Sequence, residues 1–455
     1  MSDVGISEQA VTSETDIPKS EGQLETGDGS QVKESESISV TESSTEVGEG
    51  NSGDGLASKV AAHYNTLPEA GREKRLESRI FFQRNFNNWI KSMCIADALK
   101  RLREKDRQRK IVAFDLCCGK GGDLLKWKKG QINHLVCADI AAVSVEQCEQ
   151  RYKDLQAKSQ NDRNKLFTAE FYTADCAEEI LTDLYKTPDM TFDLTSCQFS
   201  FHYSFETIKR ADTMLRNACE RLKPGGLFVG TIPNGCELVR RVKHSEGLSF
   251  GNDVYRVTFK DKENFPLFGC IYDFHLEGVV DCPEFLVYFP LLERMAKKYG
   301  MRLLYSDTFA EFFKKHSRDR ENCQLLSRMK ALEAFPPFDK TSASQTEGDY
   351  DHAVKFLAKL KSESGREGDN KRLKVGTLSK AEWEAASLYL VFAFIKEDVT
   401  ADKGEDKNAE EEEERTLPEE EEEEAGPSED AAAVKDLERE EMGITEEPVT
   451  KKQKT

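Results

Sequence analysis

The stretch Ile111-Val-Ala-Phe-Asp-Leu-Cys-Cys-Gly-Lys-Gly-Gly-Asp123 decides the fold. An apolar run ends on an acidic residue, and a glycine-rich loop then opens into a helix-forming segment, which predicts strand, loop and helix. A second apolar run, Leu135-Val-Cys-Ala-Asp139, also ends on an acid. Glycines such as Gly119 let the backbone approach a nucleoside, and an acid at the next strand tip can accept hydrogen bonds from ribose hydroxyls. The two runs therefore predict a nucleoside cofactor on an open α/β sheet.

Further apolar runs alternate with amphipathic helical segments. The remaining strands are expected at 170–175, 192–199, 227–232, 301–306 and 387–394. Helices are expected over 144–157 and 206–222, the second one stopped by Lys223-Pro-Gly-Gly226. This alternation predicts an α/β fold with a doubly wound, Rossmann-like sheet of seven mostly parallel strands and right-handed crossovers.

Two segments interrupt this order. Residues 235–283 contain alternating runs typical of antiparallel strands, so we expect an antiparallel insertion there. After this first segment, residues 284–299 read as a helix of the main order. Residues 314–374 are polar, with helical pieces and few core positions, and are expected to form a small helical lobe.

The charge of the chain is unevenly distributed. Residues 1–58 hold 13 acids and two lysines, and residues 397–455 hold 24 acids and eight bases, out of a net charge of -19. The part between them, 59–396, therefore carries +8 and is expected to be the catalytic domain, with an anionic ligand. Both ends are expected to be disordered acidic tails, because their composition cannot form a core.

The cysteine usage and the hydropathy of the chain indicate the cellular compartment. All 12 cysteines lie between the tails, several in strand-like runs, and none forms Cys-x-x-Cys. This usage is typical of a reducing compartment and predicts no metal site. No apolar run has transmembrane length and no signal peptide is recognisable, so we expect an intracellular protein that does not bind a membrane.

Polar residues follow the expected strands where ligands bind in open α/β sheets. They are Asp115, Lys120, Asp139, Asp175, Gln198 and the pair His202-Tyr203. A single acid at a strand end is more often a helix cap, but three on successive strands favour a binding site. A dinucleotide oxidoreductase is the rival interpretation. Asp123 at the helix start disfavours the pyrophosphate that such an enzyme binds there.

The sheet, the loop, the acids and the Lys-Pro-Gly-Gly turn resemble class I S-adenosylmethionine-dependent methyltransferases. Three longer strings narrow the resemblance to the vertebrate-type mRNA cap guanine-N7 methyltransferases. They are Ile80-Phe-Phe-Gln-Arg-Asn-Phe-Asn-Asn-Trp-Ile-Lys91, Gln198-Phe-Ser-Phe-His-Tyr203 and Asp273-Phe-His-Leu-Glu-Gly-Val-Val-Asp-Cys-Pro-Glu-Phe-Leu-Val287. The resemblance runs from about residue 60 to residue 396.

The resemblance assigns roles to individual residues. It implies contacts with S-adenosylmethionine, and with the product S-adenosylhomocysteine, for Lys91, Cys117, Gly119, Asp139, Asp175, Gln198 and Tyr203. Within that set Lys91 would pair with the cofactor's carboxylate, Asp139 would hold the ribose and Asp175 would read the adenine. For the capped RNA it implies Asn87, Asn88, Lys120, Lys126, Arg151, His202, Glu284 and Tyr389. Cys117 stands where the family has glycine, which predicts crowding of the cofactor.

The implied reaction moves a methyl group to guanine N7 by in-line displacement. N7 carries a lone pair and no proton, so we expect positioning and electrostatics by His202, Tyr203 and Glu284 rather than general-base catalysis. The resemblance also implies a nuclear location. As partners it implies the capped 5′ end of RNA and a small activating subunit. Contacts with the transcription and capping machinery and with an import receptor are further expectations. The alternatives are a transferase for another RNA or nucleotide, and a cap-binding scaffold without activity.

Overall fold

The computed structural model describes residues 60, 65, 76–160, 166–337, 344, 346–364 and 373–398. Residues 1–58, and all but two residues of 397–455, lie outside this described part, so the expected acidic tails are not addressed. Within the described residues, no helix is both long enough and apolar enough to cross a membrane.

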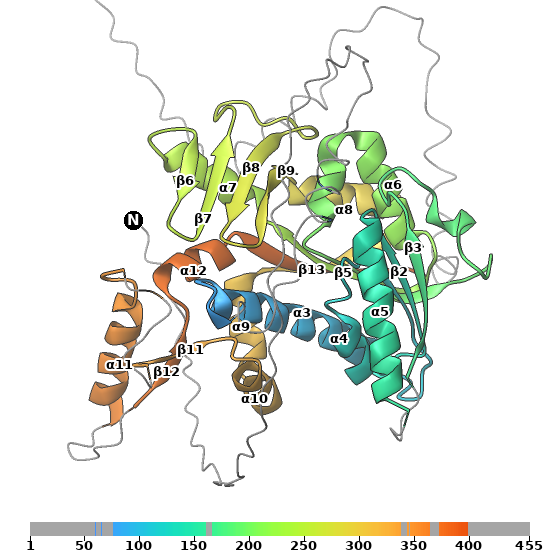
Figure 1. Cartoon of the computed structure of the whole chain (residues 1–455). Helices are drawn as coiled ribbons and strands as arrows, with labels where there is room; N and C mark the ends of the chain where they lie inside the picture. The colour runs from blue at the N-terminus through green and yellow to red at the C-terminus, as the bar shows by residue number, and fades with distance from the viewer. Residues whose placement is uncertain are drawn as a thin grey trace, which may run out of the picture.

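A seven-stranded sheet forms the centre of the molecule (Figure 1). Its strand order is β10-β13-β5-β4-β1-β2-β3. The strands are β1 (Val112–Leu116), β2 (His134–Asp139), β3 (Thr168–Thr173), β4 (Phe192–Gln198), β5 (Leu222–Pro233), β10 (Met301–Thr308) and β13 (Tyr389–Lys396). Only β13 runs antiparallel to its neighbours β5 and β10, so the predicted doubly wound, mostly parallel sheet is confirmed.

Helices cover both faces of this sheet. The helices outside the small lobe are α3 (Phe81–Leu102), α4 (Leu124–Lys129), α5 (Ala142–Lys158), α6 (Ile208–Cys219), α7 (Gly235–His244), α8 (Phe289–Lys297), α9 (Phe309–His316) and α12 (Lys380–Ala386), with 3-10 turns η1 (Leu181–Asp183) and η2 (Phe201–Glu206). Alternate residues of each strand enter opposite cores. Ala113 and Cys137 pack on the side of α3, whereas Phe114 and Val136 pack on the side of α6 and α8.

The insertion after β5 forms a second, antiparallel sheet of four strands, as predicted. Its strands are β6 (Ser249–Gly251), β7 (Tyr255–Phe259), β8 (Ile271–Leu276) and β9 (Val280–Phe285). The last strand contradicts the sequence prediction of a helix over 284–299, because Glu284 belongs to β9 and the helix α8 begins at Phe289. Pro283 is tolerated because β9 is an edge strand that pairs only with β8.

A small lobe lies between α9 and β13. It contains α10 (Arg320–Arg328), β11 (Glu333–Phe335), α11 (Asp351–Ser364) and β12 (Val375–Thr377). Strands β11 and β12 pair with each other, and Ala353 and Leu357 of α11 share a core with Val375 of β12. These three elements share a small core of their own, whereas Leu326 of α10 packs in the main core, and the predicted helical lobe therefore also contains a pair of strands.

Two predicted boundaries moved. Helix α5 begins before Ser144, which lies inside the helix and does not cap it. Lys223-Pro-Gly-Gly226 is not a turn before the fifth strand but part of β5, whose pairing with β4 shifts register there. Gly225, at φ +74, supplies the backbone conformation that this bulge needs.

Candidate active site

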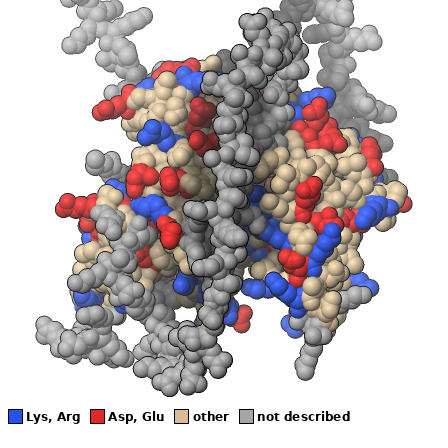
Figure 2. Space-filling view, in the orientation of Figure 1, with Lys and Arg blue, Asp and Glu red and all other residues tan. Residues whose placement is uncertain are grey.

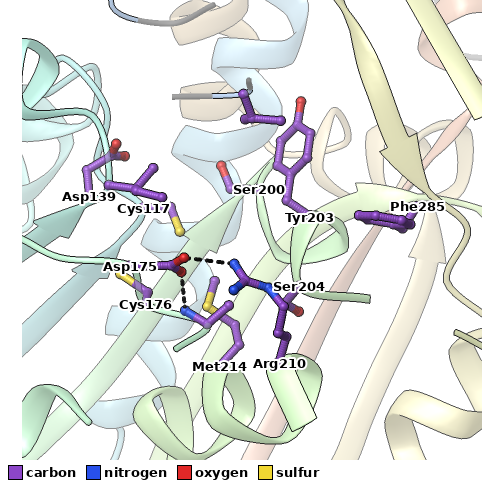
Figure 3. A pocket seen from close by; sticks show the side chains of 13 residues that line it. Cys117, Asp139, Asp175, Cys176, Ser200, Tyr203, Ser204, Arg210, Met214 and Phe285 are labelled. Atoms are coloured by element: carbon purple, nitrogen blue, oxygen red, sulfur yellow. Dashed lines mark hydrogen bonds and ion pairs between the residues drawn. The ribbon is translucent and has the colours of Figure 1, made fainter. Parts of the chain in front are cut away.

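A pocket opens at the carboxyl ends of β1, β2 and β3 and is closed from the other side by η2 and α6 (Figure 3). It is lined by Val60, Cys117, Asp139, Ile140, Asp175, Cys176, Ala177, Ser200, Tyr203, Ser204, Arg210, Met214 and Phe285. Cys117, Asp139, Asp175 and Tyr203 were predicted site residues, and the fold brings them together. The pocket therefore lies where ligands of open α/β sheets bind.

Asp139 ends β2 and faces the glycine loop. Its Oδ2 accepts from the Gly119 N–H at 2.8 Å, and its Oδ1 accepts from the Ala141 N–H at 2.9 Å. Burial raises the pKa of the Asp139 carboxyl, and these two hydrogen bonds offset part of that shift. Each carboxylate oxygen has a second lone pair, so Asp139 holds the loop and can still accept from a ligand.

Asp175 follows β3 and is paired with a residue that the sequence analysis missed. Its Oδ1 accepts from the Ala177 N–H at 2.9 Å, and its Oδ2 accepts from Arg210 Nη2 at 2.8 Å, as the dashed lines of Figure 3 show. Arg210 lies in the first turn of α6, whose N-cap is Thr207. No motif in the sequence connects Arg210 to a site 35 residues upstream.

Cys117 has a backbone suited to glycine. Its φ is +60, in the left-handed region that side chains other than Asn and Asp rarely adopt. The neighbouring Gly119, at φ +51, has space around it for a side chain. The strained residue is therefore the one whose thiol lines the pocket.

A second group of polar side chains adjoins the pocket around Glu284. This carboxylate is only 4% exposed, and its Oε2 accepts from the Tyr272 hydroxyl at 2.7 Å. The hydroxyl of Tyr203 lies 3.4 Å from Oε1, and His202 Nε2 lies 3.3 Å from the same oxygen. Tyr203 therefore belongs to both groups, and Tyr272 is a second residue that the sequence analysis missed.

His202 is buried without satisfying its ring. Only 1% of the residue is exposed, and within the described residues neither ring nitrogen meets the geometry of a hydrogen bond. Unsatisfied polar atoms of this kind are rare in folded proteins. The ring lies beside the buried carboxylate of Glu284, 3.3 Å from its Oε1.

Basic residues around the glycine loop form a separate network. Asp123 lies 3.0 Å from Lys91 Nζ and 2.6 Å from Lys126 Nζ. Burial alone would raise the pKa of Asp123, but the two ammonium groups lower it to about 2. Lys126 also donates to the Asn88 side chain, and Arg151 donates to the Lys120 carbonyl at 2.7 Å.

The other predicted residues stand apart from the pocket lining. Gln198 is buried at the end of β4, where its amide contacts Ser196 at 3.0 Å and Thr231 at 3.1 Å. Tyr389 begins β13 and packs edge-on against Phe199. Lys91, Gly119, Gln198, Asn87, Asn88, Lys120, Lys126, Arg151, His202, Glu284 and Tyr389 do not line the pocket.

One acid at a strand end proved structural. Asp115 is 2% exposed and accepts from Trp127 Nε1 at 3.1 Å. Burial raises the pKa of its carboxyl, and the negative charge of Asp123 raises it further. Of the three acids in the sequence pattern, only Asp139 and Asp175 reach the pocket.

Comparisons with known proteins identify a family. A family model described as the mRNA (guanine-N(7))-methyltransferase domain matches residues 48–397. The mRNA cap guanine-N(7) methyltransferase of Drosophila melanogaster is 48% identical over 343 residues, which are 74% of this chain and 76% of that protein. The protein of that name from Caenorhabditis elegans is 40% identical, over 78% of this chain and 90% of its own. The mRNA cap guanine-N(7) methyltransferase 1 of Oryza sativa subsp. japonica is 34% identical, over 78% of this chain and 85% of that protein.

Proposed function

The chain belongs to the mRNA cap guanine-N7 methyltransferase family, and we propose that its pocket holds S-adenosylmethionine beside a guanine-binding wall built around Glu284. The enzyme methylates N7 of the terminal guanine of the mRNA cap. The observation that carries the proposal is Tyr203, which lines the pocket and also lies 3.4 Å from Glu284. One side chain thus joins a site for each reactant.

The chemistry of the pocket fits an adenosine. Asp139 offers acceptors for two ribose hydroxyls while its bonds to the loop backbone fix its position. Asp175, held by Arg210, offers an acceptor for the exocyclic amine of adenine. At the edge of the loop, Lys91 supplies a positive charge for a carboxylate, and Cys117, Gly119 and Gln198 complete the proposed set.

When bound, the cofactor would supply an electrophilic methyl group on its sulfonium: the lone pair of guanine N7 would bond to the methyl carbon as the carbon–sulfur bond breaks, leaving S-adenosylhomocysteine. Guanine N7 carries no proton, so no side chain needs to act as a base. A methylated guanine is cationic, and its Watson–Crick edge is a stronger hydrogen-bond donor than that of neutral guanine. The buried Glu284 carboxylate therefore stabilises the developing cation more than the ground state, which is what accelerates a reaction. The same carboxylate selects guanine over adenine, which lacks a matching pair of donors.

The orientation of the guanine would come from the residues around Glu284. His202 has unsatisfied nitrogens, Tyr203 borders both sites, and Tyr272 fixes the carboxylate from behind. Tyr389, packed on Phe199, adds an aromatic side chain at the start of β13. Holding two reactants in this way accounts for up to about 7–11 kcal/mol in favourable systems.

The phosphates of the cap require positive charge nearby. Figure 2 shows lysine and arginine side chains gathered on the face that carries α4 and the lower part of α5. The proposed contacts are Lys120, Lys126 and Arg151, with Asn87 and Asn88 from α3. Charge-assisted bonds from these groups would neutralise the triphosphate bridge and set the depth of the guanine.

Location and partners follow from the reaction. Capping of nascent mRNA places the enzyme in the nucleus, close to the transcription and capping machinery, with import by a receptor. A small activating subunit would have its dock on the lobe of α10, β11, α11 and β12, of which β11, α11 and β12 share a core separate from that of the sheet.

A methyl-transfer assay tests the function and its rivals together. Labelled S-adenosylmethionine is incubated with GpppG-capped RNA, with the same RNA bearing a 5′ triphosphate, and with free GTP, and the methylated position is identified. We expect N7-methylguanosine from the capped RNA alone. Equal methylation of uncapped RNA or GTP would favour a different transferase. If the protein bound the cap but neither bound the cofactor nor methylated the RNA, the result would favour a scaffold.

A further inference from the structure

Three cysteines form a cluster directly beneath the glycine loop. Cys118 follows β1, Cys137 lies in β2 and Cys148 lies in α5, and their sulfur atoms are all within 4.8 Å of one another. All three are buried, and only Cys118 has any appreciable exposure, at 9%. Among the described residues, this is the one group of three or more His, Cys, Asp or Glu side chains placed to hold an ion.

The number and type of these ligands restrict what they can hold. Three thiols select a soft, thiophilic ion. A structural zinc site takes four ligands, and no fourth His, Cys, Asp or Glu of the described chain belongs to the group. Three thiolates around a monovalent or divalent ion would also leave net negative charge. The cysteines belong to the core that also holds Leu124, Leu135 and Phe167, and added negative charge is costly there beside the carboxylates of Asp115 and Asp123.

We propose that Cys118, Cys137 and Cys148 form a three-thiol site for trivalent arsenic. Arsenous acid, As(OH)₃, exchanges its three hydroxyls for three thiols. Three As–S bonds form, three As–O bonds break, and the thiol protons leave with the hydroxyls as three waters, without an oxidant or reductant. The product is three-coordinate and neutral, so it matches the number of sulfur ligands and adds no charge to the core.

The site is mechanically joined to the glycine loop. A Cβ added to Gly121 would lie 2.8 Å from the Cys148 sulfur, so that thiol already packs tightly against the loop. Cys118 is flanked by Cys117, which lines the pocket, and by Gly119, whose N–H binds Asp139. An arsenic atom between the three sulfurs therefore displaces the loop and weakens cofactor binding. This consequence, unlike the site itself, rests on the proposed function.

Arsenic binding is measured first, without reference to activity. The reduced full-length protein is incubated with arsenite, freed of excess by gel filtration, and analysed for arsenic content and by X-ray absorption. We expect one arsenic per chain with three sulfur neighbours. Less than one tenth of an equivalent, or a shell of oxygen or of two sulfurs, would overturn the proposal, and this test needs no variant.

Variants then locate the ion. Cys118→Ala and Cys148→Ala should each lower retained arsenic at least tenfold. Two control variants should leave the retained arsenic unchanged. Cys219→Ala changes a buried cysteine in α6, and Cys176→Ala changes a cysteine that lines the pocket together with Cys117. Loss of arsenic in Cys176→Ala, or its retention in Cys148→Ala, would contradict the assignment.

Titration of S-adenosylmethionine into the loaded and unloaded protein tests the coupling. We expect the Kd for the cofactor to rise at least fivefold on loading. Full arsenic binding with an unchanged Kd would refute the coupling alone. Absence of cofactor binding before loading would instead contradict the proposed function.

Discussion

The two ends of the active site are built in different ways. The cofactor end is made by consecutive strand–helix units: Cys117 follows β1, Asp139 ends β2 and Asp175 follows β3. The guanine end joins His202 and Tyr203 of η2 to Tyr272 and Glu284 of the inserted sheet, about 80 residues later. The cofactor end is local in sequence and partly open, whereas the guanine end is non-local and buried.

The difference separates two tasks. Binding a nucleoside requires acceptors at strand tips, which the fold supplies wherever strands end. Accelerating methyl transfer requires a fixed charge that is better matched to the transition state, and such a charge works best where water is excluded. Variants at the guanine end should therefore change the rate, and variants at the cofactor end should change the affinity for the cofactor.

The largest effect is expected from Glu284→Gln. The amide keeps the size of the side chain but loses the charge, so kcat for capped RNA should fall by about 100-fold or more. The Kd for S-adenosylmethionine, measured by calorimetry, should stay within about twofold. The control is Glu277→Gln, an exposed residue after β8, which should leave kcat unchanged. If Glu284→Gln kept its rate, the electrostatic role would be lost.

Asp139→Ala should affect the other end. Without the carboxylate, both the proposed ribose contacts and the bonds to Gly119 and Ala141 disappear, so the cofactor Kd should rise about 10- to 100-fold. Asp139→Asn keeps one oxygen acceptor and should give an intermediate value. Binding of a cap analogue, followed by fluorescence, should be nearly unchanged; equal loss of both ligands would remove the distinction between the two ends.

Tyr272→Phe sharpens the comparison, because it leaves the charge of Glu284 in place and removes the hydroxyl that positions it. A hydrogen bond to a charged group contributes about 1.5–3 kcal/mol, so kcat should fall about tenfold or somewhat more. KM for S-adenosylmethionine should not change. The matched control is Tyr152→Phe, whose hydroxyl donates to the Phe167 carbonyl far from Glu284. A change in KM with kcat intact would assign Tyr272 to the cofactor end.

The smallest effect is expected from Cys117→Gly. Glycine adopts φ +60 without strain, but it also increases the entropy of the unfolded chain, so stability should change by less than about 1 kcal/mol. Removing Cβ and sulfur from the pocket should lower the cofactor Kd a few-fold. Cys117→Ala, which keeps Cβ, separates backbone strain from the bulk of the thiol. Weaker binding in Cys117→Gly would show that the thiol contributes a contact.

Much of the cofactor end could be predicted from sequence. Strand, loop and acid recur within about 30 residues, so periodicity and glycines locate Asp139 and Asp175. The same reasoning failed for Asp115, because nothing in the pattern shows that Trp127 binds its carboxylate inside the core. Arg210 was missed for a related reason, since its partner Asp175 lies on another element.

The guanine end was less predictable. Glu284 was expected in a helix, because Leu286 and the apolar residues after it resemble a helical face and Pro283 argues against a strand. Only the pairing of β9 with β8, at the edge of the inserted sheet, makes this segment extended. Tyr272 becomes visible as its partner only through the cross-strand register in which it faces Glu284.

The place of β13 has a consequence for protein synthesis. This strand is formed from the last residues of the sheet, yet it lies between β5 and β10. On the ribosome, those two strands emerge long before Tyr389–Lys396 and must wait with their edges unpaired. The nascent chain is therefore most exposed to aggregation just before its synthesis reaches Tyr389, and a premature stop there would give an open sheet and no enzyme.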